Sequence, residues 1–151
     1  MQINENGEHI ALYMLGCDYL YGNGVEPDYS HGIALVSQAA NYGILGAQYE
    51  LGKGYFYGLW GLPKRYSEAF RWLRKCDDMR ESQFLLSACY LYGEGVEKDV
   101  RMAESYLVKS GNLSYDYAIK GLISFYGDGV HVPRNPQKEA YWRERLREIE
   151  E

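Results

Sequence analysis

The chain lacks the features of a disulfide scaffold, a membrane-spanning protein or a nucleic-acid binder. It has three cysteines in 151 residues, an odd number without regular spacing, so no disulfide framework is expected. No segment approaches the roughly 18 consecutive apolar residues that predict a membrane-spanning helix. The 16 lysines and arginines are outnumbered by 21 aspartates and glutamates. We therefore expect neither membrane insertion nor the clustered basic surface that binds a phosphate backbone.

No secretory signal is expected from the start of the sequence. Residues 1–9 contain two glutamates and no apolar run. Together with the irregular cysteines, this favours a reducing, cytoplasmic location. Hydrophobic residues make up 46% of the chain and charged residues 25%, which is enough apolar material for a packed core. A chain of this length predicts one domain.

Catalytic and metal-binding motifs are missing. His9, His31 and His131 have no His or Cys partner three or four residues along, so no helical metal pair is expected. The cysteines have no nucleophile signature, and Cys76 and Cys89 are interpreted as small apolar fillers. The Gly-x-Gly segments lack the further residues of a phosphate loop. We expect no enzyme, no metal and no cofactor, with a small-molecule-binding or hydrolytic protein as the minor alternative.

Tyrosine, in contrast, is abundant, with 16 copies, and the dipeptide Tyr-Gly recurs at intervals of 36, 35 and 34 residues. Its four copies are Tyr21-Gly22, Tyr57-Gly58, Tyr92-Gly93 and Tyr126-Gly127. A self-similar period of this length predicts a stacked repeat protein, a class that works mostly through binding surfaces.

Each copy predicts a helix that ends at Tyr-Gly. In the first three copies Ala or Ser, Leu and Tyr recur at i, i+4 and i+8, as in Ala47, Leu51 and Tyr55, which is one stripe of an α-helix. The residue after the Leu is Gly or Ser, small enough for a neighbouring helix to approach closely. In the fourth copy Asp116 and Lys120 fall at the Ala and Leu places. We expect this helix to use a shifted face of Tyr117, Ala118, Leu122 and Phe125.

A glycine-rich turn and a second helix follow each Tyr-Gly. The glycines predict helix C-caps, and Asp28, Asp99 and Asn135 predict the N-caps of second helices. These helices are expected to end near Tyr42, Lys75, Lys109 and Glu148. The last helix has one apolar stripe, at Trp142, Leu146 and Ile149, and reads as a capping helix.

The pattern Ala-x3-Leu-Gly-x2-Tyr-x-Tyr-Gly-x-Gly-Val-x2-Asp-x3-Ala resembles the Sel1-like repeat, a relative of the tetratricopeptide repeat. The resemblance covers about residues 9–150 and implies an all-α fold, a right-handed αα-solenoid with an adaptor or scaffold role. The repeats are expected at 9–43, 44–78, 79–112 and 113–150, within a single solenoid domain of residues 1–151.

The resemblance also places the first helix of each repeat on a concave face. Positions eight and four before the repeat tyrosine, and that tyrosine itself, project away from the Ala-Leu-Tyr stripe. An aromatic ladder there would bind protein well. The candidate partner-binding residues are Tyr13, Met14, Tyr49, Glu50, Lys53, Tyr57, Trp60, Phe84 and Tyr92. Met14, Glu50 and Lys53 are expected to be exposed, while the Tyr-Gly tyrosines fit either the ladder or a core between helices.

These features favour a non-enzymatic protein-interaction module that binds a protein or peptide on its concave face. A narrower alternative comes from the likeness of short, acidic proteins of this family to cytoplasmic immunity proteins of bacterial toxin or secretion systems. The sequence fits a monomer or an end-to-end dimer, and it does not name the partner.

Overall fold

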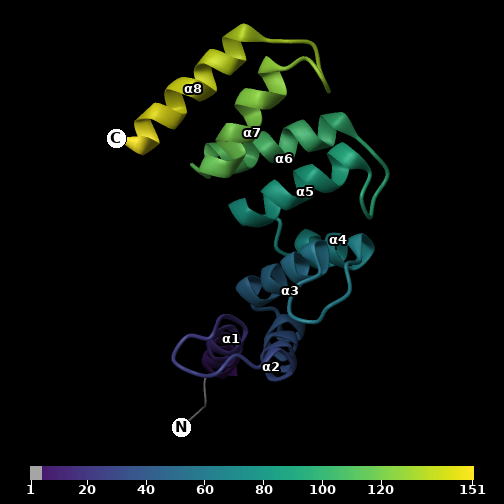
Figure 1. The fold of residues 1–151 in the computed structure, drawn as a ribbon, viewed down its shortest axis with the longest axis vertical. Coiled ribbons are helices and arrows are strands. Elements are labelled where there is room, and N and C mark those ends of the chain that lie inside the picture. The colour runs from purple at the N-terminus through teal and green to yellow at the C-terminus, as the bar shows by residue number, and fades with distance from the viewer. Residues whose placement is uncertain (1–4) are drawn as a thin grey trace. The chain divides into compact units, whose positions relative to one another are not determined.

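The computed structural model describes residues 5–151, which contain eight α-helices and no strand. The helices are α1 (Glu5–Tyr21), α2 (Tyr29–Tyr42), α3 (Leu45–Tyr57), α4 (Tyr66–Lys75), α5 (Arg80–Tyr92), α6 (Val100–Asn112), α7 (Asp116–Gly127) and α8 (Pro136–Glu150). They pack as four consecutive hairpins, α1 with α2, α3 with α4, α5 with α6 and α7 with α8 (Figure 1). The predicted all-α repeat fold is confirmed.

The chain forms two compact units. The first unit contains α1–α4 and ends at Cys76, and the second unit is Asp77–Glu151 with α5–α8. Each unit holds two helical hairpins, because one hairpin alone leaves an apolar face open that a neighbouring hairpin must cover.

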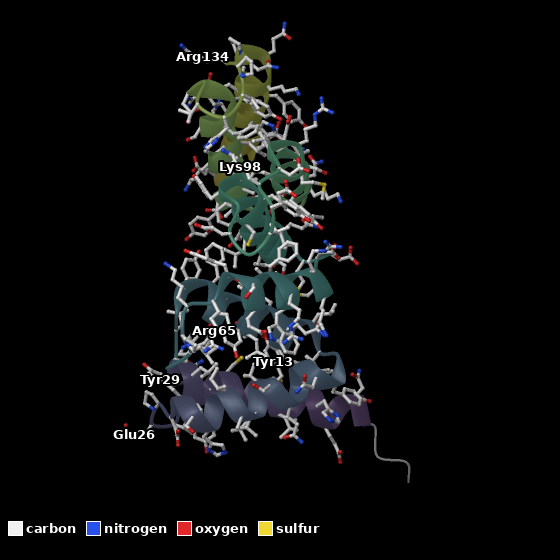
Figure 2. The ribbon with its side chains drawn as sticks, turned by 90° about the vertical axis from the view of Figure 1, so that its right-hand side faces the viewer. Tyr13, Glu26, Tyr29, Arg65, Lys98 and Arg134 are labelled. Carbon is white, nitrogen blue, oxygen red and sulfur yellow. The ribbon has the colours of Figure 1, made fainter. Side chains whose placement is uncertain are left out.

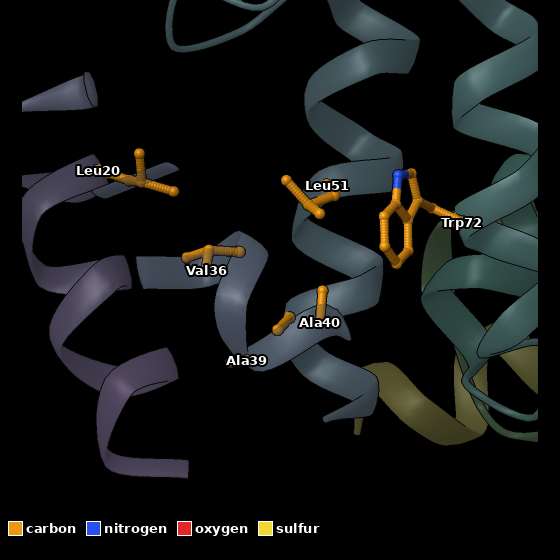
Figure 3. Close-up of a cluster of buried hydrophobic side chains, with 7 residues drawn as sticks. Leu20, Val36, Ala39, Ala40, Leu51 and Trp72 are labelled. Atoms are coloured by element: carbon orange, nitrogen blue, oxygen red, sulfur yellow. The ribbon is translucent and has the colours of Figure 1, made fainter. Parts of the chain in front are cut away.

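The core of the first unit lies between its two hairpins (Figure 3). Its buried members are Leu20, Val36, Ala39, Ala40, Ala47, Leu51 and Trp72. Glycine allows α1 and α2 to approach closely, since a Cβ on Gly16 would lie 2.7 Å from Cγ2 of Val36. Likewise, a Cβ on Gly32 would lie 2.7 Å from Cδ2 of Leu20. The small residue predicted after the Leu of the stripe therefore has the expected role in this hairpin.

The second unit has a separate core. Its buried members are Leu107, Ala118, Ile119, Leu122, Phe125, Tyr126 and Trp142. Trp142 is the one buried residue of α8, Leu146 is partly buried and Ile149 is exposed. The apolar stripe of α8 thus packs at Trp142 and opens toward water at its end.

The predicted N-caps are confirmed. Asp28 accepts a hydrogen bond from the backbone N–H of His31, Asp99 from that of Met102, and Asn135 from that of Lys138. Arg65 holds the same position before α4 (Figure 2) but provides no side-chain cap. The first helices of the first three repeats, α1, α3 and α5, also end as expected. Gly22, Gly58 and Gly93 have φ of 70°, 68° and 68°, a conformation that only glycine adopts without cost.

The fourth repeat is out of register with its own Tyr-Gly, and this corrects the sequence alignment. In the first three repeats the N-cap residue of the second helix donates its N–H to the carbonyl of the tyrosine two places before Tyr-Gly. These bonds are Asp28 to Tyr19, Arg65 to Tyr55 and Asp99 to Tyr90. In the fourth repeat Asn135 donates to Tyr126. Tyr126 therefore corresponds to Tyr19, and Asp128 takes the place of the repeat tyrosine.

This register restores the helix stripe in the fourth repeat. Ala118, Leu122 and Tyr126 are all buried at the spacing i, i+4, i+8, while Asp116 and Lys120 form a surface ion pair of 3.8 Å. The predicted shifted face is correct at Ala118, Leu122 and Phe125. It is wrong at Tyr117, which is exposed.

Candidate functional site

The tyrosines of the first three Tyr-Gly pairs are surface residues. Tyr21 is 46% exposed, Tyr57 is exposed and Tyr92 is 61% exposed, so the core alternative is wrong for these three. Tyr126 is 3% exposed, because it occupies the position of Tyr19 and belongs to the buried stripe of its helix. These tyrosines lie at the ends of first helices, and within each unit Tyr21 and Tyr92 face the first helix of the next hairpin.

In the first unit Tyr21 joins α1 to α3 through a polar network with Glu50 and Lys53. The Tyr21 hydroxyl donates to Oε2 of Glu50 at 2.7 Å and accepts from Nζ of Lys53 at 2.7 Å. Lys53 Nζ also lies 3.5 Å from Oε2 of Glu50. We call these three residues the Tyr21–Glu50–Lys53 network.

Three aromatic rings surround the ammonium group of the network. Lys53 Nζ lies 5.3 Å from the ring centre of Tyr21 and 5.5 Å from those of Tyr49 and Trp60, within the range of cation–π attraction. Trp60 meets Tyr21 edge-on, with ring centres 5.6 Å apart and an angle of 80°. The first unit thus encloses a lysine head group with aromatic faces and a carboxylate.

The turn after α3 positions Trp60 for its contact with Tyr21. Trp60 has φ of 56°, a left-handed conformation that costs a residue with a side chain about 1–2 kcal/mol. Gly54 leaves room for the indole, since a Cβ there would lie 3.2 Å from Cε3 of Trp60. Tyr57 and the second glycine of this turn, Gly61, are four residues apart, against three for Tyr21 and Gly24 in the first repeat, and Trp60 lies in this longer turn.

The neighbouring hydroxyl and thiol groups are held in their neutral forms. Burial, and then the hydrogen bond to Glu50, raise the pKa of Tyr21 well above its usual 10. Burial, followed by the proximity of Cys17, raises the pKa of Tyr13 to about 12. Burial and the charge of Glu50 raise the pKa of the Cys17 thiol to about 11. Cys17 is therefore a poor nucleophile near neutral pH.

Tyr13 fills a space that Gly46 leaves open on α3. A Cβ on Gly46 would lie 2.6 Å from the Tyr13 hydroxyl oxygen, so the ring sits directly on the α3 backbone. Met14, in contrast, is exposed as expected.

The predicted exposure of Glu50 is wrong, and that of Lys53 is reduced. Glu50 is 8% exposed and Lys53 is partly buried. A buried carboxylate is tolerated when it is hydrogen-bonded and paired with a positive charge. Tyr21 supplies the hydrogen bond to Glu50, and Lys53 supplies the positive charge. Helical spacing predicted that Glu50 and Lys53 lie on the same side of α3, but it could not show that they form an ion pair with each other.

In the second unit the corresponding place between first helices is an open cleft of about 250 Å³. Its walls come from α5, α6, α7 and the turn after α7. The lining residues are Phe84, Ser87, Ala88, Leu91, Tyr92, Leu107, Gly121, Ser124, Phe125, Asp128 and His131. Of the predicted site residues, Phe84 and Tyr92 lie here. Tyr57 belongs to neither site and packs edge-on against Phe56, with ring centres 4.9 Å apart.

Sequence reasoning missed the fourth-repeat side of this cleft. His131 lies edge-on to Tyr92, with ring centres 5.8 Å apart and an angle of 80°, and nearly parallel to Phe125 at 6.3 Å. Ser124 and Asp128 were hidden by the two-residue register error. The turn before Asn135 is longer than the one before Asp28, and this length was the one signal in the sequence that pointed to this region.

The described residues offer few other chemical sites. Residues 5–151 contain no group of three or more His, Cys, Asp or Glu side chains placed to hold a metal. None of the helices in this range combines the length and apolar character that crossing a bilayer demands.

Comparison with known proteins places these features in a family. A model of the Sel1 repeat matches residues 9–43, 45–75, 80–115 and 114–142. A solved structure of a protective antigen present in uropathogenic Escherichia coli strains, displaying an SLR fold, is 29% identical and superposes with a TM-score of 0.85. The match covers 95% of this chain and 31% of the antigen.

A Sel1 repeat protein from Oxalobacter formigenes is 25% identical, with a TM-score of 0.81 over 93% of this chain and 58% of that protein. The chain therefore spans about a third and just under three fifths of the two solved proteins.

Proposed function

The chain belongs to the Sel1 repeat family, and we propose that it binds a polypeptide partner whose side chain enters the cleft of the second unit. Proteins of this family are generally protein-interaction modules and typically non-catalytic scaffolds. The cleft lies between α5 and α7, the first helices of their hairpins, and the resemblance to the Sel1-like repeat led us to expect partner binding on first helices.

The open cleft is the observation that carries this proposal. Its volume of about 250 Å³ is below the range of roughly 300–1,000 Å³ that is usual for small-molecule sites, and it suits one large side chain. Apolar walls with a polar rim resemble the centre of a protein interface, where a few buried anchors supply most of the binding energy. Tyr92, 61% exposed at the edge, offers a rigid contact surface with a polar tip.

Site-specific photo-cross-linking tests the proposal. A photoreactive phenylalanine at position 92 is expected to form adducts with a polypeptide in lysate of the native host, and mass spectrometry then identifies the cross-linked segment. The matched control carries the same residue at position 29, because Tyr29 is similarly exposed but lies at the start of α2, outside the cleft.

Filling the cleft provides the second control. Ser124→Trp is expected to abolish the adduct, while Ser30→Trp on the surface of α2 leaves it unchanged. Equal adducts at positions 92 and 29, or an adduct that survives Ser124→Trp, would contradict binding in the cleft.

A further inference from the structure

We propose that the cleft of the second unit anchors a lysine side chain of the partner, with its ammonium over the Tyr92 ring and beside the Asp128 carboxylate. This inference rests on the proposed function and names the chemistry that the cleft selects. It comes from a comparison of the two units. In the first unit the side chains of Glu50 and Lys53 fill the space between the two first helices, whereas in the second unit the corresponding space is the open cleft.

The backbone gives the corresponding positions. Ile44 and Tyr115 are the residues that immediately precede α3 and α7, and each accepts the first helical hydrogen bond from the residue four places on. Counting from them, Gly121 corresponds to Glu50 and Ser124 corresponds to Lys53. The second unit therefore has small side chains where the first unit has a carboxylate and a lysine.

Two of the three rings around that place are retained, while by the same count Lys120 stands where the first unit has Tyr49. In the first unit Trp60, from the turn after α3, meets Tyr21 edge-on at 5.6 Å and 80°. In the second unit His131, from the turn after α7, meets Tyr92 at 5.8 Å and 80°. The first unit shows what this pair of rings accepts, because Lys53 Nζ lies 5.3 Å from the centre of the Tyr21 ring.

A carboxylate is also retained, but it comes from a different position. Asp128, which stands in the register of the repeat tyrosine, lines the cleft. Its Oδ1 accepts a hydrogen bond from the N–H of Val130 at 2.8 Å, so the turn fixes the side chain while the negative charge stays available. Glu50 has the matching role toward Lys53 in the first unit.

The walls suit the remainder of a lysine side chain. Leu91, Leu107 and Phe125 give an apolar surface on which a four-carbon stem can pack while its ammonium stays at the wet rim. A wholly apolar side chain would use these walls and gain nothing from Asp128. An acidic side chain would meet Asp128 as a like charge, within a chain whose net charge is −5. The cleft thus favours a lysine over both alternatives.

Three capped pentapeptides, identical except for a central lysine, norleucine or glutamate flanked by glycines, test this selectivity. Their binding to the full chain is followed by the amide NMR shifts of Gly121, Ser124 and Asp128. The lysine peptide is expected to bind about five- to tenfold more tightly than the norleucine peptide, from one cation–π contact and one exposed ion pair. The glutamate peptide is expected to bind most weakly.

Asp128→Asn is expected to reduce the lysine peptide to the level of norleucine, since asparagine keeps the acceptor for Val130 but loses the charge. Glu148→Gln, which removes an exposed carboxylate of α8 outside the cleft, is the matched control and should change nothing.

A graft of the first unit's side chains gives an independent test. Gly121→Glu with Ser124→Lys should fill the cleft with an internal lysine and abolish binding of the lysine peptide. A Cβ on Gly121 would meet nothing closer than 3.5 Å, at Cδ1 of Leu107, so the backbone accepts the change, and circular dichroism checks that the fold is kept.

Equal affinity for lysine and norleucine, no effect of Asp128→Asn, or no peptide-induced shift at all would overturn the lysine anchor. Adducts at position 92 would then still support a polypeptide site. Conversely, lysine-selective shifts without any adduct would support the anchor and count against the proposed function.

Discussion

The clearest test of the first unit is Tyr21→Phe, which removes one oxygen atom from the Tyr21–Glu50–Lys53 network. That oxygen donates to Glu50 at 2.7 Å and accepts from Lys53 at 2.7 Å. Glu50 is 8% exposed, so its carboxylate would lose a donor in a place that water reaches poorly. The aromatic ring and its contact with Trp60 remain, which isolates the hydroxyl.

The expected cost follows from the charge of the acceptor. A hydrogen bond to a charged group contributes about 1.5–3 kcal/mol, and Lys53 stays 3.5 Å from Glu50 as partial compensation. Because Tyr21 is itself half-exposed, water can replace part of the bond, and we expect a loss of about 1.5–2 kcal/mol. For a chain of 151 residues, each kcal/mol corresponds to a fall in Tm of about 2–4 °C.

Urea denaturation followed by circular dichroism measures this loss as a lower midpoint with an unchanged m-value. Tyr92→Phe is the matched control. Tyr92 is the repeat tyrosine of the third repeat, and its exposed hydroxyl is hydrogen-bonded to none of the described residues, so its removal should change stability by less than about 0.5 kcal/mol.

Equal losses for Tyr21→Phe and Tyr92→Phe would refute the reasoning. A Glu50→Gln background provides a further check: if the hydroxyl acts through the carboxylate, Tyr21→Phe should cost less there, by a coupling energy of at least about 0.5 kcal/mol.

Two further predictions concern the first unit. The first concerns the Cys17 thiol, whose pKa in the folded protein is raised to about 11. The stability that the neutral thiol contributes is complete below the ordinary thiol pKa near 9 and is lost as the pH rises through 11. Urea midpoints from pH 8 to 11 should therefore fall less steeply in Cys17→Ala than in the wild type, and equal slopes would contradict the assignment. The second concerns the start of α4, where Arg65→Asn should supply the missing cap and raise the free energy of unfolding by about 0.5–1 kcal/mol. The backbone angles of Arg65 (φ −138°, ψ 100°) are already close to those of the capping residue Asp28 (φ −141°, ψ 94°). Arg65→Ala is the control and should leave the free energy of unfolding unchanged.

The sequence predicted the helices of the first three repeats and the three N-caps, because these depend on local chemistry, although α6 extends to Asn112 and does not end near Lys109. Asp28, Asp99 and Asn135 cap their helices as predicted, and α2 and α4 end at the expected residues, Tyr42 and Lys75. Periodicity alone identifies such elements, since each is decided within one or two turns of helix.

The fourth repeat shows where local reasoning fails. Tyr126-Gly127 repeats the letters of the motif, but the hydrogen bond from Asn135 gives Tyr126 the position of Tyr19. A dipeptide cannot reveal its register, whereas the stripe of Ala118, Leu122 and Tyr126, spaced as in the other repeats, was visible in the sequence. Anchoring the alignment on that buried stripe would have placed Asp128 correctly.

The site was predicted in part for a different reason. Helical spacing put Tyr49, Lys53 and Phe84 on one side of their helices, and their role in partner binding stays a prediction. Whether such a side chain ends exposed or buried depends on what the next repeat presents to it, as Glu50 demonstrates by accepting a hydrogen bond from Tyr21, 29 residues away. Long-range pairing of this kind leaves no periodic trace.

The two units also suggest how a repeat chain can vary recognition without changing its fold. Replacement of a Glu–Lys pair by Gly121 and Ser124 converts a filled, self-satisfied contact into an open cleft, while the edge-on aromatic pair stays at 80° in both units. The exchange alters side chains on one face of a helix and leaves its buried stripe intact. Because that stripe holds the hairpins together, the facing positions can change without loss of the fold.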